Sequence, residues 1–211
     1  MDSLKQKNRY RDNLFSLSLG KTPMLRPMAQ PSKLYRFRID LSDIDRGIYE
    51  QLDFRLAMHP SESMPYMLTR ALAYACNYSQ DLQFSAQGLG DPESAALSHS
   101  DATSGRTLLW IEIGNPSPKK LHKASKASQA VKIYTYKDAS QILRDCEKEN
   151  VHQPEKIEIY QLDDKFLTTL GEESSREFRF SLMVQEGSLT ITRGEEILNS
   201  EFTRFYLKDP A

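Results

Sequence analysis

The feature that most constrains the fold is a nearly continuous apolar run, Thr107–Gly114, which contains a single charged residue, Glu112. Such a run is typical of a strand that is covered on both faces. A carboxylate without a partner would be strongly destabilising there. We therefore expect Glu112 to lie near the strand end, beside a metal ion, a cationic side chain or solvent. The run predicts both a layered fold and a position of functional interest.

The segments on either side of this run alternate between strand and helix periodicity. Strands are expected at 81–85, 107–114, 130–136 and 156–162, and helices at 61–78, 118–128, 138–149 and 163–170. Period-two alternation near both ends predicts antiparallel strands at 34–41, 52–58, 177–184, 189–193 and 202–207, while 87–106 is expected to be mainly a loop. The predicted fold is α/β, a mixed sheet with flanking helices and antiparallel hairpins at both ends.

The first 32 residues differ from the rest of the chain. They lack a sustained period and contain three closely spaced prolines, Pro23, Pro27 and Pro31. Proline opposes regular structure, so residues 1–32 are predicted to form a flexible basic tail. Of the 211 residues in the chain, this leaves 33–211, a length that suits a single domain.

Charge is unevenly distributed along the sequence. The net charge is -1, yet residues 1–33 hold seven basic and two acidic residues, and residues 119–137 hold six lysines and no acid. The net charge excludes a polybasic protein of the histone type but leaves room for local basic patches. The lysine-rich segment is either a solvated surface or a strip that faces phosphate groups.

Several classes of protein are not supported by the sequence. The longest apolar run, Ala71–Cys76, is far too short to span a bilayer, so no membrane partner is expected. The only cysteines, Cys76 and Cys146, form neither a metal motif nor a disulfide framework, which favours a cytoplasmic location. The glycine-rich nucleotide motifs and the nucleophile elbow of serine hydrolases are also absent.

Three acids are candidates for a metal site. Glu62 lies at the expected start of a helix, Glu93 lies in the loop before the apolar strand, and Glu112 interrupts that strand. Carboxylates that converge at a strand end suit Mg²⁺ or Mn²⁺. The helix that follows carries lysines suited to the phosphates of DNA or RNA: Lys119, Lys120, Lys123 and Lys126. Acids that hold a metal beside such cations can hydrolyse a phosphodiester, although each acid also has ordinary structural uses.

Several short motifs, taken together and in order, resemble the YaeQ family of bacterial proteins. They are Asp43–Arg46, Leu56–Glu62, Asp91–Glu93, Leu109–Pro116, Lys123–Ser125 and Tyr134–Tyr136. The resemblance extends over about residues 33–207, so only the predicted tail and the last few residues lie outside it.

This resemblance implies a variant of the PD-(D/E)XK fold, the core of restriction-endonuclease-like proteins. It implies that Glu62, Glu93 and Glu112 hold a divalent metal. The position of the usual strand lysine is occupied by Gly114. The resemblance therefore suggests that Lys123, on the following helix, supplies the catalytic ammonium from a migrated position.

Different functions remain open at this stage. The first is metal-dependent hydrolysis of nucleic acid by Glu62, Glu93, Glu112 and Lys123. The second is a catalytically inactive nucleic-acid-binding or transcription-associated regulatory module, which the missing strand lysine favours. A third is a protein-interaction partner that acts in transcription or stress physiology. The sequence does not indicate an oligomeric state.

Overall fold

The computed structural model describes residues 32–85, 93–172 and 175–208. The predicted tail, residues 1–32, lies almost wholly outside this part of the chain, so its flexibility stays a prediction. Contacts between Cα atoms group Pro31–Ala211 into one unit.

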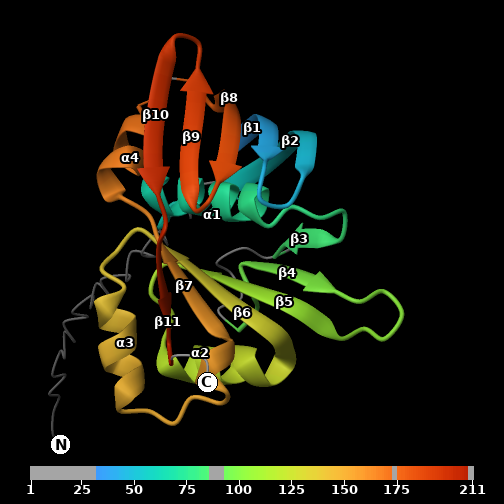
Figure 1. The fold of residues 1–211 in the computed structure, drawn as a ribbon, viewed down its shortest axis with the longest axis vertical. Helices are drawn as coiled ribbons and strands as arrows, with labels where there is room; N and C mark the ends of the chain where they lie inside the picture. The colour runs from blue at the N-terminus through green and yellow to red at the C-terminus, as the bar shows by residue number, and fades with distance from the viewer. Residues whose placement is uncertain (1–31, 86–92, 173–174, 209–211) are drawn as a thin grey trace, which may run out of the picture. The chain divides into compact units, whose positions relative to one another are not determined.

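The described strands form two sheets, one above the other in Figure 1. Sheet A has the order β10 (Glu196–Glu201), β9 (Ser188–Arg193), β8 (Glu177–Gln185), β1 (Lys33–Asp43) and β2 (Ile48–Met58). Sheet B has the order β11 (Thr203–Tyr206), β7 (Ile157–Gln161), β6 (Ser128–Thr135), β5 (Thr107–Ile113), β4 (Leu97–Ser100) and β3 (Leu82–Phe84). Both sheets are mixed, because β1 pairs with β8 in parallel and β5–β6–β7 are parallel within sheet B.

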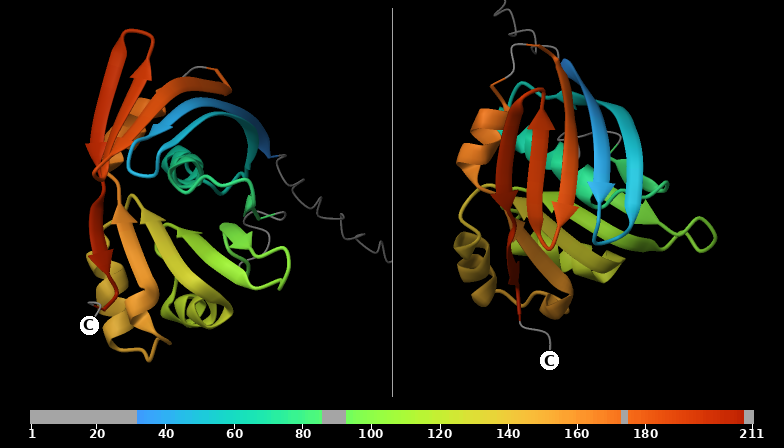
Figure 2. Two further views of the ribbon diagram at one scale, coloured as in Figure 1. Left: turned by 45° about the vertical axis from the view of Figure 1, so that its right-hand side comes forward. Right: turned by 45° about the horizontal axis from the view of Figure 1, so that its top comes forward.

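The helices complete a layered arrangement. They are α1 (Met64–Cys76), α2 (Pro118–Ala127), α3 (Ser140–Glu147) and α4 (Asp164–Leu170), with a short 3₁₀ turn, η2, at Pro154–Lys156. Helix α1 contacts β1 and β2 of sheet A and also β5 and β6 of sheet B, so it lies between the two sheets, as Figure 2 shows. Helices α2 and α3 contact each other, and α2 packs on β6. Within the described residues, no helix combines the length and the apolar content that a membrane span requires.

The expectation of a single mixed sheet was wrong, because the chain builds two. The first and last hairpins join each other through the β1–β8 pairing rather than extending the central sheet. Their inward residues form a separate core with α1 and α4, which includes Phe37, Leu68, Leu167 and Phe178. Periodicity identifies strands but does not specify which distant strands pair, and the pairing decides the number of sheets.

Three local predictions also differ from the structure. The expected loop at 87–106 contains β4, whose Leu97 is fully buried opposite Ile111 of β5. Strand β10 was not predicted. Only Leu198 and Ser200 are partly buried in it and its other residues are exposed, so it lacks a clear apolar alternation. Strand β11 lies at the edge of sheet B instead of continuing the last hairpin.

The start of α1 was placed too early. Ser63, not Ser61, is the N-cap, since its side chain accepts a hydrogen bond from the backbone N–H of Tyr66. Proline within the first two helical positions fits this start, where its missing N–H is not needed. Glu62 therefore precedes the helix and does not lie in its first turn.

Candidate functional site

A cavity of about 480 Å³ opens where β5 and β6 end and α2 begins. Its charged lining consists of five cations and two carboxylates: Arg70, Lys119, Lys120, Lys123, Lys137, Glu93 and Glu112. Because β5 and β6 are parallel, their carboxyl ends meet at one edge of sheet B. Helix α1 contributes Tyr66 from its first turn and Arg70 from its middle.

Glu112 is the buried acid of this cavity. It is the penultimate residue of β5 and is only 3% exposed. One carboxylate oxygen accepts a hydrogen bond of 2.6 Å from Trp110 Nε1, and the other accepts one of 2.8 Å from Lys120 Nζ. Burial raises the pKa of Glu112 above its ordinary value, while Lys120 and Trp110 oppose that shift. Of the three alternatives that the sequence left open for Glu112, a metal ion, a cationic side chain or solvent, the structure shows a cationic side chain, Lys120.

Glu93 and Lys123 form a second pair at the exposed side of the cavity. Lys123 Nζ donates to Glu93 Oε2 at 2.9 Å and to the Glu93 carbonyl oxygen at 3.0 Å. The side chain of Glu93 is 67% exposed and that of Lys123 is 47% exposed. Water screens this pair much more than the pair at Glu112.

The third predicted acid, Glu62, is not among the residues that line the cavity. Its oxygens lie 3.1 Å and 3.3 Å from the two Nη atoms of Arg70, and Oε2 also accepts a bond of 2.9 Å from the backbone N–H of His59. The 3.1 Å contact, at Oε1, is an ion pair without hydrogen-bond alignment. Both side chains are buried. Glu62 does not line the cavity itself, but its partner Arg70 does.

The structure thus brings three of the four predicted catalytic residues, Glu93, Glu112 and Lys123, to one cavity. The lysine that contacts Glu112 is Lys120, not Lys123. Lys120 lies in the first turn of α2, next to the end of β5, whereas Lys123 is almost one turn farther along the helix. The short connection between strand and helix is the sequence signal that favours Lys120. Lys126, also predicted to bind phosphate, is exposed but does not line the cavity.

Two tyrosines of the cavity were not predicted from the sequence. Tyr66 belongs to α1, and burial raises its pKa to about 12. Tyr136 follows β6, and its hydroxyl lies 3.2 Å from the Ser63 hydroxyl at the cap of α1. Tyr66 is therefore a neutral hydroxyl at neutral pH, and the hydroxyls of both tyrosines are able to hydrogen-bond to a ligand. Tyr136 belongs to the motif Tyr134–Tyr136, but nothing in the sequence places it beside Tyr66, because their proximity depends on how α1 packs against sheet B.

The N-terminus of α2 adds a positive electrostatic contribution. Ser117 caps the helix through the backbone N–H of Lys120, and the first turn contains no acidic residue. A helix N-terminus favours negative charge, yet two lysines, Lys119 and Lys120, stand in this turn. Positive charges at the positive end of the helix dipole repel it. A bound anion would be attracted by both the lysines and the helix N-terminus.

A comparison with protein-family models matches residues 28–202 to the model described as "YaeQ protein". The chain belongs to the YaeQ family. The sequence motifs had suggested this membership, and the match extends over most of the chain.

The chain is also similar in sequence to individual members of the YaeQ family. The chain is 27% identical over 177 residues to "Uncharacterized protein YaeQ" of Escherichia coli (strain K12), which covers 83% of this chain and 97% of that protein. The protein of the same name from Salmonella typhi gives the same identity and coverage. These relatives are themselves uncharacterised, so they establish the family but no activity.

Solved structures of YaeQ proteins share the fold. The crystal structure of the protein from Pseudomonas syringae superimposes with a TM-score of 0.74 at 29% identity and covers 83% of this chain and 97% of that chain. The structure from Xanthomonas axonopodis pv. citri gives a TM-score of 0.69 at 24% identity, with coverage of 85% and 99%. The α/β architecture described above is therefore that of the YaeQ family.

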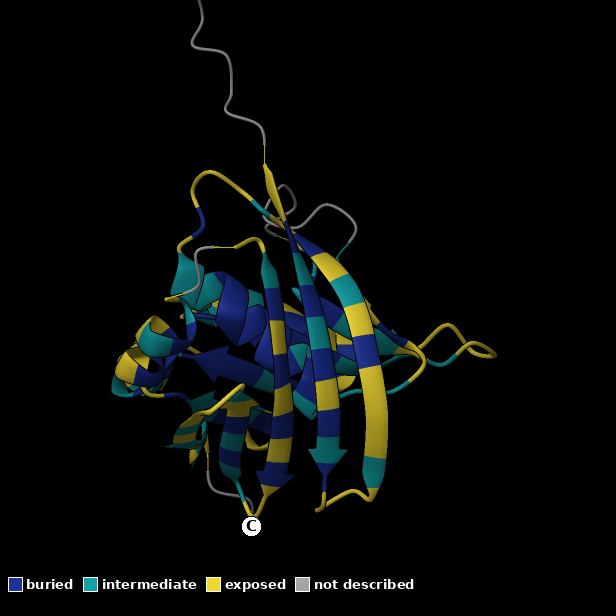
Figure 3. Cartoon of the chain, turned by 90° about the horizontal axis from the view of Figure 1, so that it is seen from above, coloured by how far each residue is buried: buried dark blue, intermediate teal, exposed yellow. Residues whose placement is uncertain are grey.

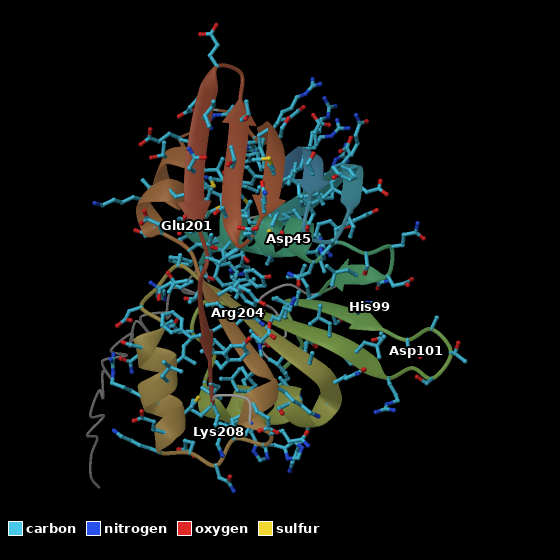
Figure 4. All side chains as sticks on the ribbon, in the orientation of Figure 1. Asp45, His99, Asp101, Glu201, Arg204 and Lys208 are labelled. Carbon is cyan, nitrogen blue, oxygen red and sulfur yellow. The ribbon has the colours of Figure 1, made fainter. Side chains whose placement is uncertain are left out.

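The scattered histidines of this YaeQ-family chain do not build a metal site in the described part. His99, labelled in Figure 4, lies on β4 with its Nε2 atom 3.8 Å from Asp81. His122 donates through Nδ1 to the Asn150 carbonyl oxygen, at 2.9 Å. Across residues 32–85, 93–172 and 175–208, no group of three or more His, Cys, Asp or Glu side chains is placed to hold a metal ion.

Proposed function

We propose that this YaeQ-family protein binds the phosphate backbone of DNA or RNA in the cavity and hydrolyses a phosphodiester with the help of Mg²⁺ or Mn²⁺. The observation that supports this best is that two acid–lysine pairs, Glu112–Lys120 and Glu93–Lys123, line the same cavity. The proposal assigns the chain a PD-(D/E)XK-like core. In that arrangement, acids from a loop and a strand end act together with a lysine.

The donor set of the cavity fits such a metal. Magnesium in phosphoryl-transfer sites is commonly held by one or two carboxylates and by oxygens of the substrate phosphate. Glu93 and Glu112 would be those carboxylates, while Glu62 would have to leave its ion pair with Arg70 to contribute. When bound, the metal would polarise a phosphate oxygen and lower the pKa of a water molecule.

Lys120 is the better candidate for the catalytic ammonium than Lys123. Gly114, at the position of the usual strand lysine, has a φ of +80°, a conformation that lysine adopts only with strain. The ammonium must therefore come from another element. Lys120 holds it 2.8 Å from Glu112, where it can stabilise the negative charge that develops on the phosphate. Lys123 is proposed to keep Glu93 oriented until substrate arrives.

Binding of the nucleic-acid backbone is supported by two cavity lysines whose charges are not used in ion pairs within the described chain. Lys119 and Lys137 line it and form no ion pair among the described residues. Together with the N-terminus of α2, they suit phosphate oxygens without reading base identity. Loss of one such contact is expected to reduce the slope of log affinity against log salt by about 0.7–0.9.

The test is a cleavage assay. Fluorescein-labelled single-stranded and duplex DNA and RNA would be incubated with the full chain in Mg²⁺ or Mn²⁺, beside Glu112→Gln and the surface control Lys148→Ala at the C-cap of α3. We expect cleavage by the wild type and the control and its loss in Glu112→Gln. Cleavage at the full rate by Glu112→Gln would refute the assignment of the site.

A second candidate function is nucleic-acid binding without cleavage. It is favoured by one observation: each of the three predicted acids is already paired with a cation, namely Glu62 with Arg70, Glu93 with Lys123 and Glu112 with Lys120. This alternative predicts binding that weakens steeply with salt, is reduced by Lys119→Ala but not by Lys148→Ala, and shows no metal-dependent cleavage.

We also propose a cytoplasmic location for this function. Both cysteines are free, Cys146 is buried and Cys76 is largely covered. Burial raises the pKa of the Cys76 thiol to about 12 and that of Cys146 to about 11. Such thiols are unreactive packing groups, which suits a reducing compartment. Mass determination of the protein isolated from cells without reductant would test the free state of both.

A further inference from the structure

The outer face of sheet A, on the side away from α1, is not covered by any described element. Along β1 the side chains alternate, so that Phe37 and Ile39 are buried toward α1 while Arg36 and Arg38 point the opposite way. Figure 3 looks onto this face and shows exposed and buried bands alternating along the strands. Figure 2 shows α1 on the inner side of the sheet.

Six charged side chains gather on this face where β2, β1 and β8 run side by side. This charged block consists of Arg36, Arg38, Asp53, Arg55, Glu177 and Arg179. Asp40 follows it on β1, opposite Gln51 and Ser181, and adds a third carboxylate to the face at the edge of the block. The two carboxylates of the block itself are used within it, because Arg36 binds Asp53 at 2.6 Å and Arg38 binds Glu177 at 2.9 Å. Two positive charges are thus left without an ion pair in the described part of the chain, those of Arg55 and Arg179.

The block is arranged with like charges directly opposite. Arg36 lies opposite Arg55 on β2, and Arg38 lies opposite Arg179 on β8. Like charges in such cross-strand positions destabilise a sheet. A glutamate at position 55 or 179 would replace each repulsion by an ion pair. The arrangement is therefore not the one that sheet stability favours, and it leaves two guanidinium groups presented to solvent.

The same face carries most of the large apolar side chains that are exposed. Of five such residues in the described chain, four belong to it: Leu34, Tyr49, Met183 and Ile197, which are 51%, 66%, 39% and 61% exposed. Leu34 lies before Arg36 on β1. Tyr49 and Met183 both lie opposite Ser42, beyond Asp40, at the other end of the block. The charged block is therefore bordered by apolar side chains at both ends.

We propose that the outer face of sheet A is a docking surface for an acidic segment of a partner protein. Carboxylates of the partner would bind Arg55 and Arg179, and apolar side chains on either side would pack on Leu34 and on Tyr49 with Met183. Arginine, tyrosine and methionine are the residues enriched at protein interfaces. The bidentate geometry of arginine also matches carboxylates. This docking surface is independent of the proposed nuclease function.

Other occupants fit the face less well. The N-terminal segment of the chain is basic, with seven basic and two acidic residues in 1–33, so it would be repelled by the unpaired arginines. A nucleic-acid backbone would match the arginines but would gain nothing from the apolar border. The mixture of guanidinium and apolar groups is the observation that favours a polypeptide.

The test uses synthetic probes and the full chain. Fluorescence anisotropy would measure the binding of three labelled probes: an alternating Glu/Leu peptide, a Glu/Gly peptide of equal charge, and single-stranded DNA of equal charge. The variant is Arg55→Glu with Arg179→Glu. A matched control, Arg144→Glu with Lys148→Glu, makes the same change of charge on α3 and at its C-cap, where Arg144 and Lys148 are exposed.

We expect the Glu/Leu peptide to bind the wild type and the control at least tenfold more tightly than the variant, and more tightly than the Glu/Gly peptide. The thermal midpoint of the variant should be unchanged or higher, which excludes unfolding as the cause of weaker binding. Unchanged peptide affinity in the variant, absence of peptide binding, or equal binding of the two peptides would overturn the proposal. DNA binding that the variant abolishes, without peptide binding, would assign the face to nucleic acid instead.

Discussion

The two acid–lysine pairs of the cavity have the same chemistry and nearly the same length but very different surroundings. Lys120 and Glu112 lie 2.8 Å apart, with side chains 22% and 4% exposed. Lys123 and Glu93 lie 2.9 Å apart, with side chains 47% and 67% exposed. Because water screens the second pair, the two contacts differ in energy although the distances agree. The comparison teaches that burial, not contact distance, decides what each pair contributes.

The difference in burial follows from the elements that carry the acids. Glu112 is fixed within β5, which has β4 on one side and β6 on the other. Glu93 stands before β4, outside the regular elements. The buried pair is therefore expected to stabilise the fold, and the exposed pair to open at little cost when a ligand arrives. Four changes to the molecule would test this distinction.

The largest effect is expected from Lys120→Met. The substitution keeps much of the apolar stem but leaves the buried Glu112 carboxylate without its cation. Breaking a buried pair in this way costs about 3–5 kcal/mol of unfolding free energy, and the lower end applies because Lys120 is partly exposed. Urea denaturation at pH 7 measures it. The double variant Lys120→Met with Glu112→Gln should recover most of the loss. A single variant as stable as the wild type would mean that the pair does not stabilise the fold.

The next effect concerns the second hydrogen bond to Glu112. Trp110→Phe removes the indole N–H that donates to Glu112 at 2.6 Å and keeps an aromatic ring in the core. We expect a loss of about 1–3 kcal/mol from the unsatisfied carboxylate, together with some loss of packing. The same denaturation in the Glu112→Gln background should show a smaller loss, since a neutral acceptor needs the bond less. Equal losses in both backgrounds would attribute the effect to packing alone.

The third effect is a dependence of stability on pH. Burial raises the pKa of Glu112 in the folded state above its ordinary value. The folded protein therefore binds this proton more tightly than the unfolded chain, and stability falls as pH rises from about 4.5 through the raised pKa. Each unit of increase in pKa corresponds to about 1.4 kcal/mol. Glu112→Gln should remove this component from a stability curve measured between pH 4 and 8, and an unchanged curve would contradict the assignment.

The smallest effect is expected from Lys123→Ala. Its pair with Glu93 is exposed, so the free energy of unfolding should change by less than about 0.5–1 kcal/mol. The effect on nucleic-acid affinity is the more informative measurement. If Lys123 leaves Glu93 to bind phosphate, the same variant should alter that affinity. Lys148→Ala serves as the control for both measurements. A loss of stability as large as that of Lys120→Met would abolish the distinction between the two pairs.

Much of the central architecture could be predicted from the sequence. The apolar run at 107–114 became β5, and the lysine-rich segment became α2, with bounds close to those expected. These segments are long and strongly patterned, so local periodicity identifies them. It could also be anticipated that Glu112 has a partner, because a lone buried charge would be strongly destabilising. The identity of that partner was not predicted: the short connection after β5 favours the first turn of α2 over Lys123, but it does not separate Lys120 from Lys119, which differ only in direction from the helix.

By itself, the sequence determined the family, most of the strands and helices, and the position of one costly carboxylate. Tertiary structure alone decided that β1 pairs with β8 and so makes two sheets, that Arg70 neutralises Glu62, and that four arginines meet on one face of sheet A. The physical reason is the range of the interactions. Periodicity, capping and the cost of buried charge act between neighbours along the chain. Strand pairing and ion pairing act between residues that only folding brings together.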